Sequence, residues 1–127
     1  MPSHAVHQTV IKNNEAMIER LVSQRNVDDN PWLLVITYFT IRHYIERAAD
    51  GVNDIAPKPY EDLVEFLSAK DSLATQYFTR MHVFSMFIQY GVSVDSRVCK
   101  LATNIIMGSG FREELKVYVK IIKDALE

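Results

Sequence analysis

The strongest constraint on the fold is the stretch from Asn30 to Gly51, NPWLLVITYFTIRHYIERAADG. Asn30 followed by Pro31 is a helix-start signal, because an asparagine side chain can accept a free N–H of the first turn and proline at the first helical position loses no hydrogen bond. No charged residue occurs from Trp32 to Ile41. A helix that is apolar on every face is surrounded by other helices. We therefore predict a central helix, with Trp32 either inside the protein or on an interface at its start.

The rest of the 127-residue chain also has helical spacing of its apolar residues, and no alternating strand pattern stands out. The four prolines and four glycines fall at the edges of the segments. The predicted fold class is all-α, in one domain over residues 1–127. A first helix is expected over about Ser3–Gln24, with Ser3 as its N-terminal cap. Four more helices are expected after the central one: Pro59–Leu67, Asp71 or Ser72 to Tyr90, Ser93 or Asp95 to Ile106, and Phe111–Leu126. Gly108-Ser109-Gly110 separates the last two.

Each predicted helix has an apolar stripe that is expected to face the core. The stripes are Val10, Ile11, Met17, Ile18 and Leu21; Leu63, Val64, Phe66 and Leu67; Leu73, Tyr77, Met81, Phe84 and Ile88, widened by Phe78, Val83, Phe87 and Tyr90; Val98, Leu101, Ile105 and Ile106; and Leu115, Tyr118, Val119, Ile122 and Leu126. The opposite face of the last helix carries Arg112, Glu113, Lys116, Lys120 and Lys123.

Composition excludes several classes of protein. The net charge is −2, so no global field attracts nucleic acid or anionic lipid, and a DNA-binding role is not expected. The single cysteine, Cys99, cannot form an internal disulfide and fits a reducing cytoplasm. The N-terminal residues lack the features of a signal peptide, and the longest apolar run is too short to cross a bilayer, so no membrane association is expected.

The segment Tyr38-Phe39-Thr40-Ile41-Arg42-His43-Tyr44-Ile45-Glu46 resembles the second helix of uncharacterised prokaryotic HEPN-like proteins. In that group an aromatic pair precedes a His, an aromatic residue and often a Glu. The context agrees: His7 and Asn14 on the first helix, a Pro-Trp entry to the second, and a later helix that ends in Tyr90-Gly91. The resemblance implies an up-and-down bundle of four to five helices, often homodimeric.

Two features depart from this pattern. The loop after the central helix, Pro57-Lys58-Pro59-Tyr60-Glu61-Asp62, has no His, and Arg42 precedes the His where a small or apolar residue is usual. RNases of the HEPN superfamily carry an Arg, four to six residues and then a His. No pair in this sequence has that spacing, so the resemblance implies the fold and weakens the expectation of RNase activity.

Other chemistry has little support in the sequence. His4 and His7 have the spacing of a metal-binding pair, but no Cys or acidic residue lies at a companion position, and no metal or other cofactor is expected. There is no Gly-x-Ser-x-Gly motif and no Cys paired with a spaced His, so no catalytic residue is assigned.

The remaining candidate is a polar cluster at the charged end of the central helix. It is either a pocket or a hydrogen-bonded set that fixes how the helices pack, and His43 is expected to be mostly buried and bonded to His7 or Asn14. The cluster residues are His7, Asn14, Arg42, His43, Tyr44 and Tyr90, and the candidate phosphate rim is Arg47, Lys70 and Arg80.

Three functions are consistent with these observations. The first is a non-catalytic HEPN-like module that binds a protein partner or a nucleotide or RNA ligand, as a homodimer. The second is a toxin-like HEPN RNase with a rearranged active site. The third is a structural assembly subunit without a small ligand.

Overall fold

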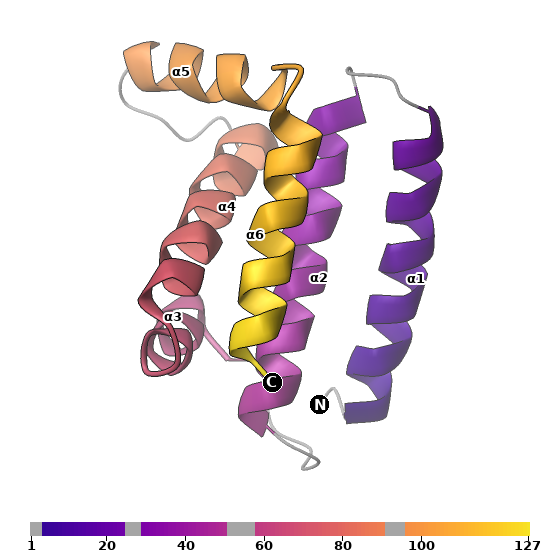
Figure 1. Ribbon diagram of the computed structural model, residues 1–127, viewed down its shortest axis with the longest axis vertical. Coiled ribbons are helices and arrows are strands. Elements are labelled where there is room, and N and C mark those ends of the chain that lie inside the picture. Colours follow the sequence, from indigo (N-terminus) through magenta and orange to yellow (C-terminus); the bar gives the residue numbers. More distant parts are fainter. Residues whose placement is uncertain (1–3, 25–28, 51–57, 91–95) are drawn as a thin grey trace.

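The computed structural model describes residues 4–24, 29–50, 58–90 and 96–127, and these residues form six helices. No residue in these ranges lies in a strand, which confirms the all-α prediction. The helices are α1 (His4–Gln24), α2 (Asn30–Asp50), α3 (Tyr60–Ser68), α4 (Ser72–Tyr90), α5 (Ser96–Ile106) and α6 (Phe111–Ala125). The four long helices α1, α2, α4 and α6 alternate in direction (Figure 1). The six helices correspond to the six segments predicted from helical spacing, whereas the resemblance implied four to five. The short α3 and α5 lie between long helices.

Local sequence signals place most of the helix ends correctly. Asp71 caps α4, since its carboxylate accepts the backbone N–H of Ala74 at 3.1 Å. Pro59 directly precedes α3. The chain breaks between α5 and α6 at Gly108, where a Cβ would come within 3.1 Å of the Asn104 carbonyl oxygen. The predictions for Ser3, Gly51, Gly91, Ser93 and Asp95 lie outside the described residues.

The core forms between α2, α4 and α6, closed at one end by α3 and at the other by α5. Leu34, Tyr38, Ile41 and Ile45 of α2 are fully or almost fully buried there, as the charge-free face predicted. The described residues of α1 contribute no member to this core cluster; Ile18 packs against it from outside. Helix α1 packs mainly on α2, whereas α6 contacts both α2 and α4.

The predicted stripe of α4 is correct in part. Phe78 and Met81 are fully buried, and Tyr77, Phe84 and Ile88 pack against the core, as predicted. Leu73 and Val83 are exposed, contrary to prediction, and Ala74 and Ser85 complete the buried row. The ring of Phe78 stacks on Tyr38 of α2 at 5.6 Å, which turns this row towards α2. Apolar residues occupy both rows, so the spacing alone could not choose between them.

Three other large apolar side chains lie outside the core. Trp32, for which the sequence left both an inside and an interface position open, is 62% exposed, because Leu33 and Leu34 are the residues of the first turn of α2 that face inwards. Met17 and Leu101 are also exposed, contrary to prediction, since Ile11 and Ala102 take the buried positions of α1 and α5.

Asn30 lies at the predicted start of α2, but its side chain links helices. Its amide nitrogen donates to the Ile106 carbonyl oxygen at the end of α5 at 2.8 Å, and its amide oxygen accepts from Arg112 Nε of α6 at 2.8 Å. The side chain is 2% exposed. The helix start was therefore predicted correctly, whereas the role of the side chain was not.

None of the helices in the described part of the chain has both the length and the apolar content needed to cross a bilayer.

Candidate functional site

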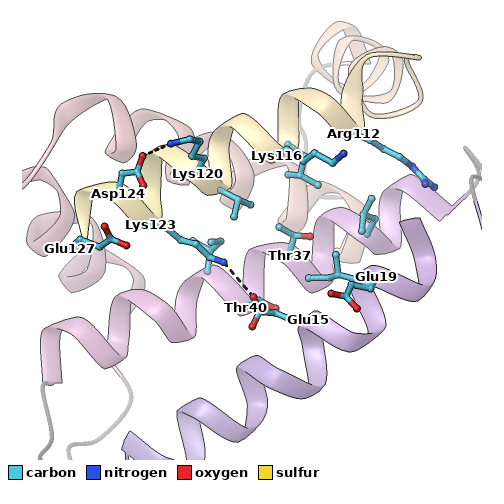
Figure 2. A pocket seen from close by; sticks show the side chains of 15 residues that line it. Glu15, Glu19, Thr37, Thr40, Arg112, Lys116, Lys120, Lys123, Asp124 and Glu127 are labelled. Carbon is cyan, nitrogen blue, oxygen red and sulfur yellow. Dashed lines mark hydrogen bonds and ion pairs between the residues drawn. The ribbon is translucent and has the colours of Figure 1, made fainter. Parts of the chain in front are cut away.

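A groove of about 470 Å³ lies between α1 and α6, with α2 at its base (Figure 2). It exists because α1 packs on α2 without an extensive contact to α6. The base consists of Leu33, Thr37, Thr40 and Ile41 of α2. These positions recur at helical spacing, so they form one face of α2 along two turns. Ile18, Leu115 and Val119 extend the apolar surface onto the two neighbouring helices.

Thr37 is the unusual residue of this base. Thr40 donates its hydroxyl to the Ile36 carbonyl oxygen at 2.7 Å, the ordinary arrangement for threonine in a helix. The Thr37 hydroxyl is buried, and it is the one buried side-chain polar atom of the described residues without a hydrogen-bond partner. The whole residue is 5% exposed. A buried hydroxyl without a partner costs about 1–3 kcal/mol.

The side of the groove formed by α6 is basic. Arg112, Lys116, Lys120 and Lys123 lie on one face of α6, and Asp124 and Glu127 follow at its end. Lys116 pairs with Glu113 at 3.2 Å and Lys120 with Asp124 at 2.9 Å. The hydrogen bond to Asp124 raises the pKa of Lys120. Exposed pairs of this kind contribute little to stability, so these lysines can change partners at small cost.

The side of the groove formed by α1 is acidic, with Glu15 and Glu19 one turn apart. Glu15 Oε2 accepts the hydroxyl of Tyr44 at 3.2 Å and pairs with Lys123 Nζ at 3.4 Å. The Lys123 ammonium also lies 4.5 Å from the centre of the Tyr44 ring. We call this set the Glu15–Tyr44–Lys123 bridge. It spans α1, α2 and α6, and Figure 2 shows its ion pair crossing between α1 and α6.

The predicted polar cluster does not form one pocket among the described side chains. Tyr44 belongs to the bridge just described, whereas Arg42 donates to the Lys58 carbonyl oxygen at 3.1 Å and pairs with Glu46 at 3.6 Å. His43 is half-buried and makes interactions of its own, and Asn14 is half-buried on α1. The side chains of the last two predicted members, His7 and Tyr90, lie outside the described set.

The predicted phosphate rim is also distributed over the molecule. Arg47 lies 4.9 Å above the Tyr44 ring and Lys70 lies 5.2 Å from the Phe66 ring. Arg80 donates to the Tyr118 hydroxyl at 2.9 Å, and that hydroxyl donates to Glu114 at 2.5 Å. Burial, followed by the bond to Glu114, raises the pKa of Tyr118 to about 12, so its hydroxyl stays neutral. The three cations therefore stabilise separate contacts.

A second cluster brings together side chains from α2, α3 and α4. Nδ1 of His82 hydrogen-bonds to the Tyr38 hydroxyl at 2.5 Å, and the imidazole stacks on Tyr60 with ring centres 3.7 Å apart. Burial raises the pKa of Tyr38 to about 12. Burial also lowers the pKa of His82, and the positive charge of Arg42 lowers it further. His82 is thus held neutral within the protein, with its ring face and one nitrogen already in use.

No group of three or more His, Cys, Asp or Glu side chains in the described ranges is arranged to hold a metal ion. No protein-family model, curated protein or solved structure matches this chain. The groove is therefore interpreted from its own geometry.

Sequence reasoning missed the groove because its two sides are about a hundred residues apart in the chain. The only signals present were the four regularly spaced bases of the last helix and the acids Glu15 and Glu19 of the first. Each set alone is what a solvent-exposed helix face looks like. Only the packing of α1 and α6 around α2 makes them the two sides of one feature.

Proposed function

We propose that this protein is a non-catalytic binding module and that the groove between α1, α2 and α6 is its binding site. The observation that supports this most is an aliphatic groove of about 470 Å³ with the orphaned Thr37 hydroxyl in its base. Binding sites are concave, largely apolar, and contain a few polar groups that fix orientation. The groove has all three properties, and none of its lining residues forms a nucleophile–base pair.

The charges of the groove favour a protein partner over a nucleotide or RNA. Its lining includes four acids and four bases, so its formal charge is zero. A polyanion would gain at Arg112 and Lys116 and lose at Glu15 and Glu19. None of the lining residues is aromatic, so no ring is available to stack on a base.

An uncharged fluorescent dye tests whether the groove binds an external molecule. Nile red should bind saturably at about one molecule per chain. Val119→Glu, which places a carboxylate inside the groove, should weaken binding at least tenfold. Val117→Glu is the matched control, since Val117 is exposed on the same helix and is not part of the lining. Equal dye binding by both variants, with cooperative thermal unfolding retained, would contradict the proposal.

The Tyr38–Tyr60–His82 cluster favours one alternative function. The fold brings Arg42 close enough to His82 to affect its pKa, although the two residues lie forty positions apart in the sequence. An HEPN-type RNase with a rearranged active site needs such an Arg–His pair. Arg42, however, is bonded to the Lys58 carbonyl oxygen and Glu46, which makes a structural role the better interpretation.

Membership of the HEPN-like superfamily, a homodimeric state and a cytoplasmic location stay predictions from the sequence. The alternating long helices are compatible with the first of these. Light scattering on the purified chain would test the second.

A further inference from the structure

We propose that the occupant of the groove is an amphipathic helix of a protein partner, with acidic residues on the flank that faces α6 and a basic residue on the flank that faces α1. This inference rests on the proposed function and specifies the partner's chemistry.

The shape of the groove fits a helix. Its lining on α6 extends from Arg112 to Asp124, which corresponds to about 18 Å of helix at 1.5 Å per residue. The groove thus follows the axis of α6 for about three turns. An apolar stripe of a helix, with residues at every third or fourth position, is complementary to a groove of this length, whose partly exposed apolar side chains are Ile18 and Val119 of its walls.

The packing of the bundle leaves room for one more helix. In a four-helix bundle each helix packs against two neighbours. Here α1 packs on α2 but has no extensive contact with α6. The largest direct link between α1 and α6 among the described contacts is the Glu15–Lys123 ion pair. A helix laid over α2 would contact both α1 and α6 and cover Ile18, Leu115 and Val119.

The opposite charges of the two sides define how the partner helix is oriented. Lys116 and Lys120 project from α6, and their present ion pairs are solvent-exposed. Acidic residues of a partner could replace Glu113 and Asp124 as the neighbours of these lysines. Glu19 of α1 forms no ion pair with another residue in the described part of the chain and would attract a basic residue on the other flank. Because the Glu15–Tyr44–Lys123 bridge crosses the groove, the helix is expected to lie mainly towards the Arg112 end.

A displayed peptide library tests the partner's chemistry without knowledge of its identity. The library contains 15-residue helical peptides with a fixed aliphatic stripe and flank positions randomised among Glu, Lys, Gln and Ser. The target is the full chain. We expect enrichment of peptides with Glu on one flank and Lys on the other.

Two charge-reversed variants serve as matched targets. In Lys116→Glu/Lys120→Glu the selected flank should change from Glu to Lys, and peptides selected on the original protein should bind at least tenfold more weakly. Lys70→Glu/Lys100→Glu changes the net charge equally at exposed positions outside the groove and should leave the selection unchanged.

The outcomes separate this inference from the proposed function. Three results would overturn the helix proposal: no peptide is enriched, all enriched peptides are acidic on both flanks, or the flank preference is the same for Lys116→Glu/Lys120→Glu as for the original protein. In each case, Nile red binding would still support the groove as a binding site. Loss of dye binding to Val119→Glu and Val117→Glu alike would overturn the proposed function itself. Concentration-dependent self-association that Val119→Glu abolishes would make a second copy the occupant and overturn the partner helix.

Discussion

Thr37 and Thr40 lie three residues apart on α2, and their hydroxyls have opposite surroundings. Thr40 bonds to the preceding turn, whereas Thr37 keeps a buried hydroxyl without a partner. The sequence could predict that both residues lie in the stretch of the central helix that contains no charged residue. It could not predict which hydroxyl lacks a partner, because that depends on a side-chain rotation and on the distance to α1 and α6.

Thr37→Val should raise the free energy of unfolding by about 1 kcal/mol, because it removes a buried hydroxyl that has no hydrogen bond and keeps a β-branched side chain. Urea denaturation of the free protein measures this. Thr40→Val is the control, and it should give no such gain, since the Thr40 hydroxyl already has an acceptor. Equal effects of the two substitutions would contradict the description of Thr37.

His82 should make the protein less stable in mild acid. Its pKa in the folded state lies below the ordinary value of 6.5, through burial first and the charge of Arg42 second, while Glu61 of α3 opposes the shift. Below about pH 6.5 the unfolded chain therefore binds more protons than the folded protein. The contribution of neutral His82 to the free energy of unfolding is fully present above that pH and is lost as the pH falls through the folded-state pKa. The rings of Tyr38 and Tyr60, together with Glu46 beside Arg42, complete the surroundings of this imidazole.

Urea unfolding at pH 7.5 and pH 5.0 tests this dependence. The loss of stability between the two values should be smaller in His82→Gln than in the original protein. His43→Gln controls for the other histidines and should retain the contribution of His82. A pH dependence that is unchanged in His82→Gln would show that other groups cause it.

At the scale of elements, one side chain connects the ends of three helices. Asn30 begins α2, and its amide bonds to the end of α5 and to Arg112 at the start of α6. Helix starts and stops follow from local residue types, which is why Asn30–Pro31, Asp71 and Gly108 were read correctly. The partner of Asn30 across the bundle depends on residues more than seventy positions away, and no local rule contains that information.

Asn30→Ala should lower the free energy of unfolding by about 1–3 kcal/mol, because it leaves the Ile106 carbonyl and the Arg112 guanidinium without their buried partner. Thermal or urea denaturation measures the loss. Asn30→Asp is the informative comparison, since it keeps an acceptor for Arg112 but loses the donor to Ile106, and a good helix cap is retained. If Asn30→Asp were as stable as the original protein, capping rather than the link between helices would be the function of Asn30.

At the scale of the whole molecule, the protein should not cleave RNA. The Arg and His spacing of HEPN RNases is missing from the sequence, and Arg42 and His82 are already engaged with Glu46 and Tyr38. Mixed-sequence single-stranded RNA incubated with excess protein should stay intact for hours. Cleavage that disappears in His82→Ala or His43→Ala would favour the RNase alternative.

The fold class was predictable from sequence because helical spacing and a charge-free central helix are properties of neighbouring residues. The choice between two apolar rows of α4 was not, since Leu73 and Ala74 are equally acceptable until Phe78 meets Tyr38. The groove was not predictable either. Its base, on α2, reads as ordinary core, and the base residues are indeed buried. The groove above them exists because α1 has no extensive contact with α6.

The bonds of Asn30 also have a consequence for the order of events during protein synthesis. They connect residues separated by 76 and 82 positions in the chain. On a ribosome, α1 and α2 emerge many seconds before α6 at typical elongation rates of about 5–20 residues per second. Until α4 and α6 follow, α1 alone can cover the apolar face of α2, and the nascent chain exposes Leu34, Tyr38 and Ile41 to solvent and to chaperones.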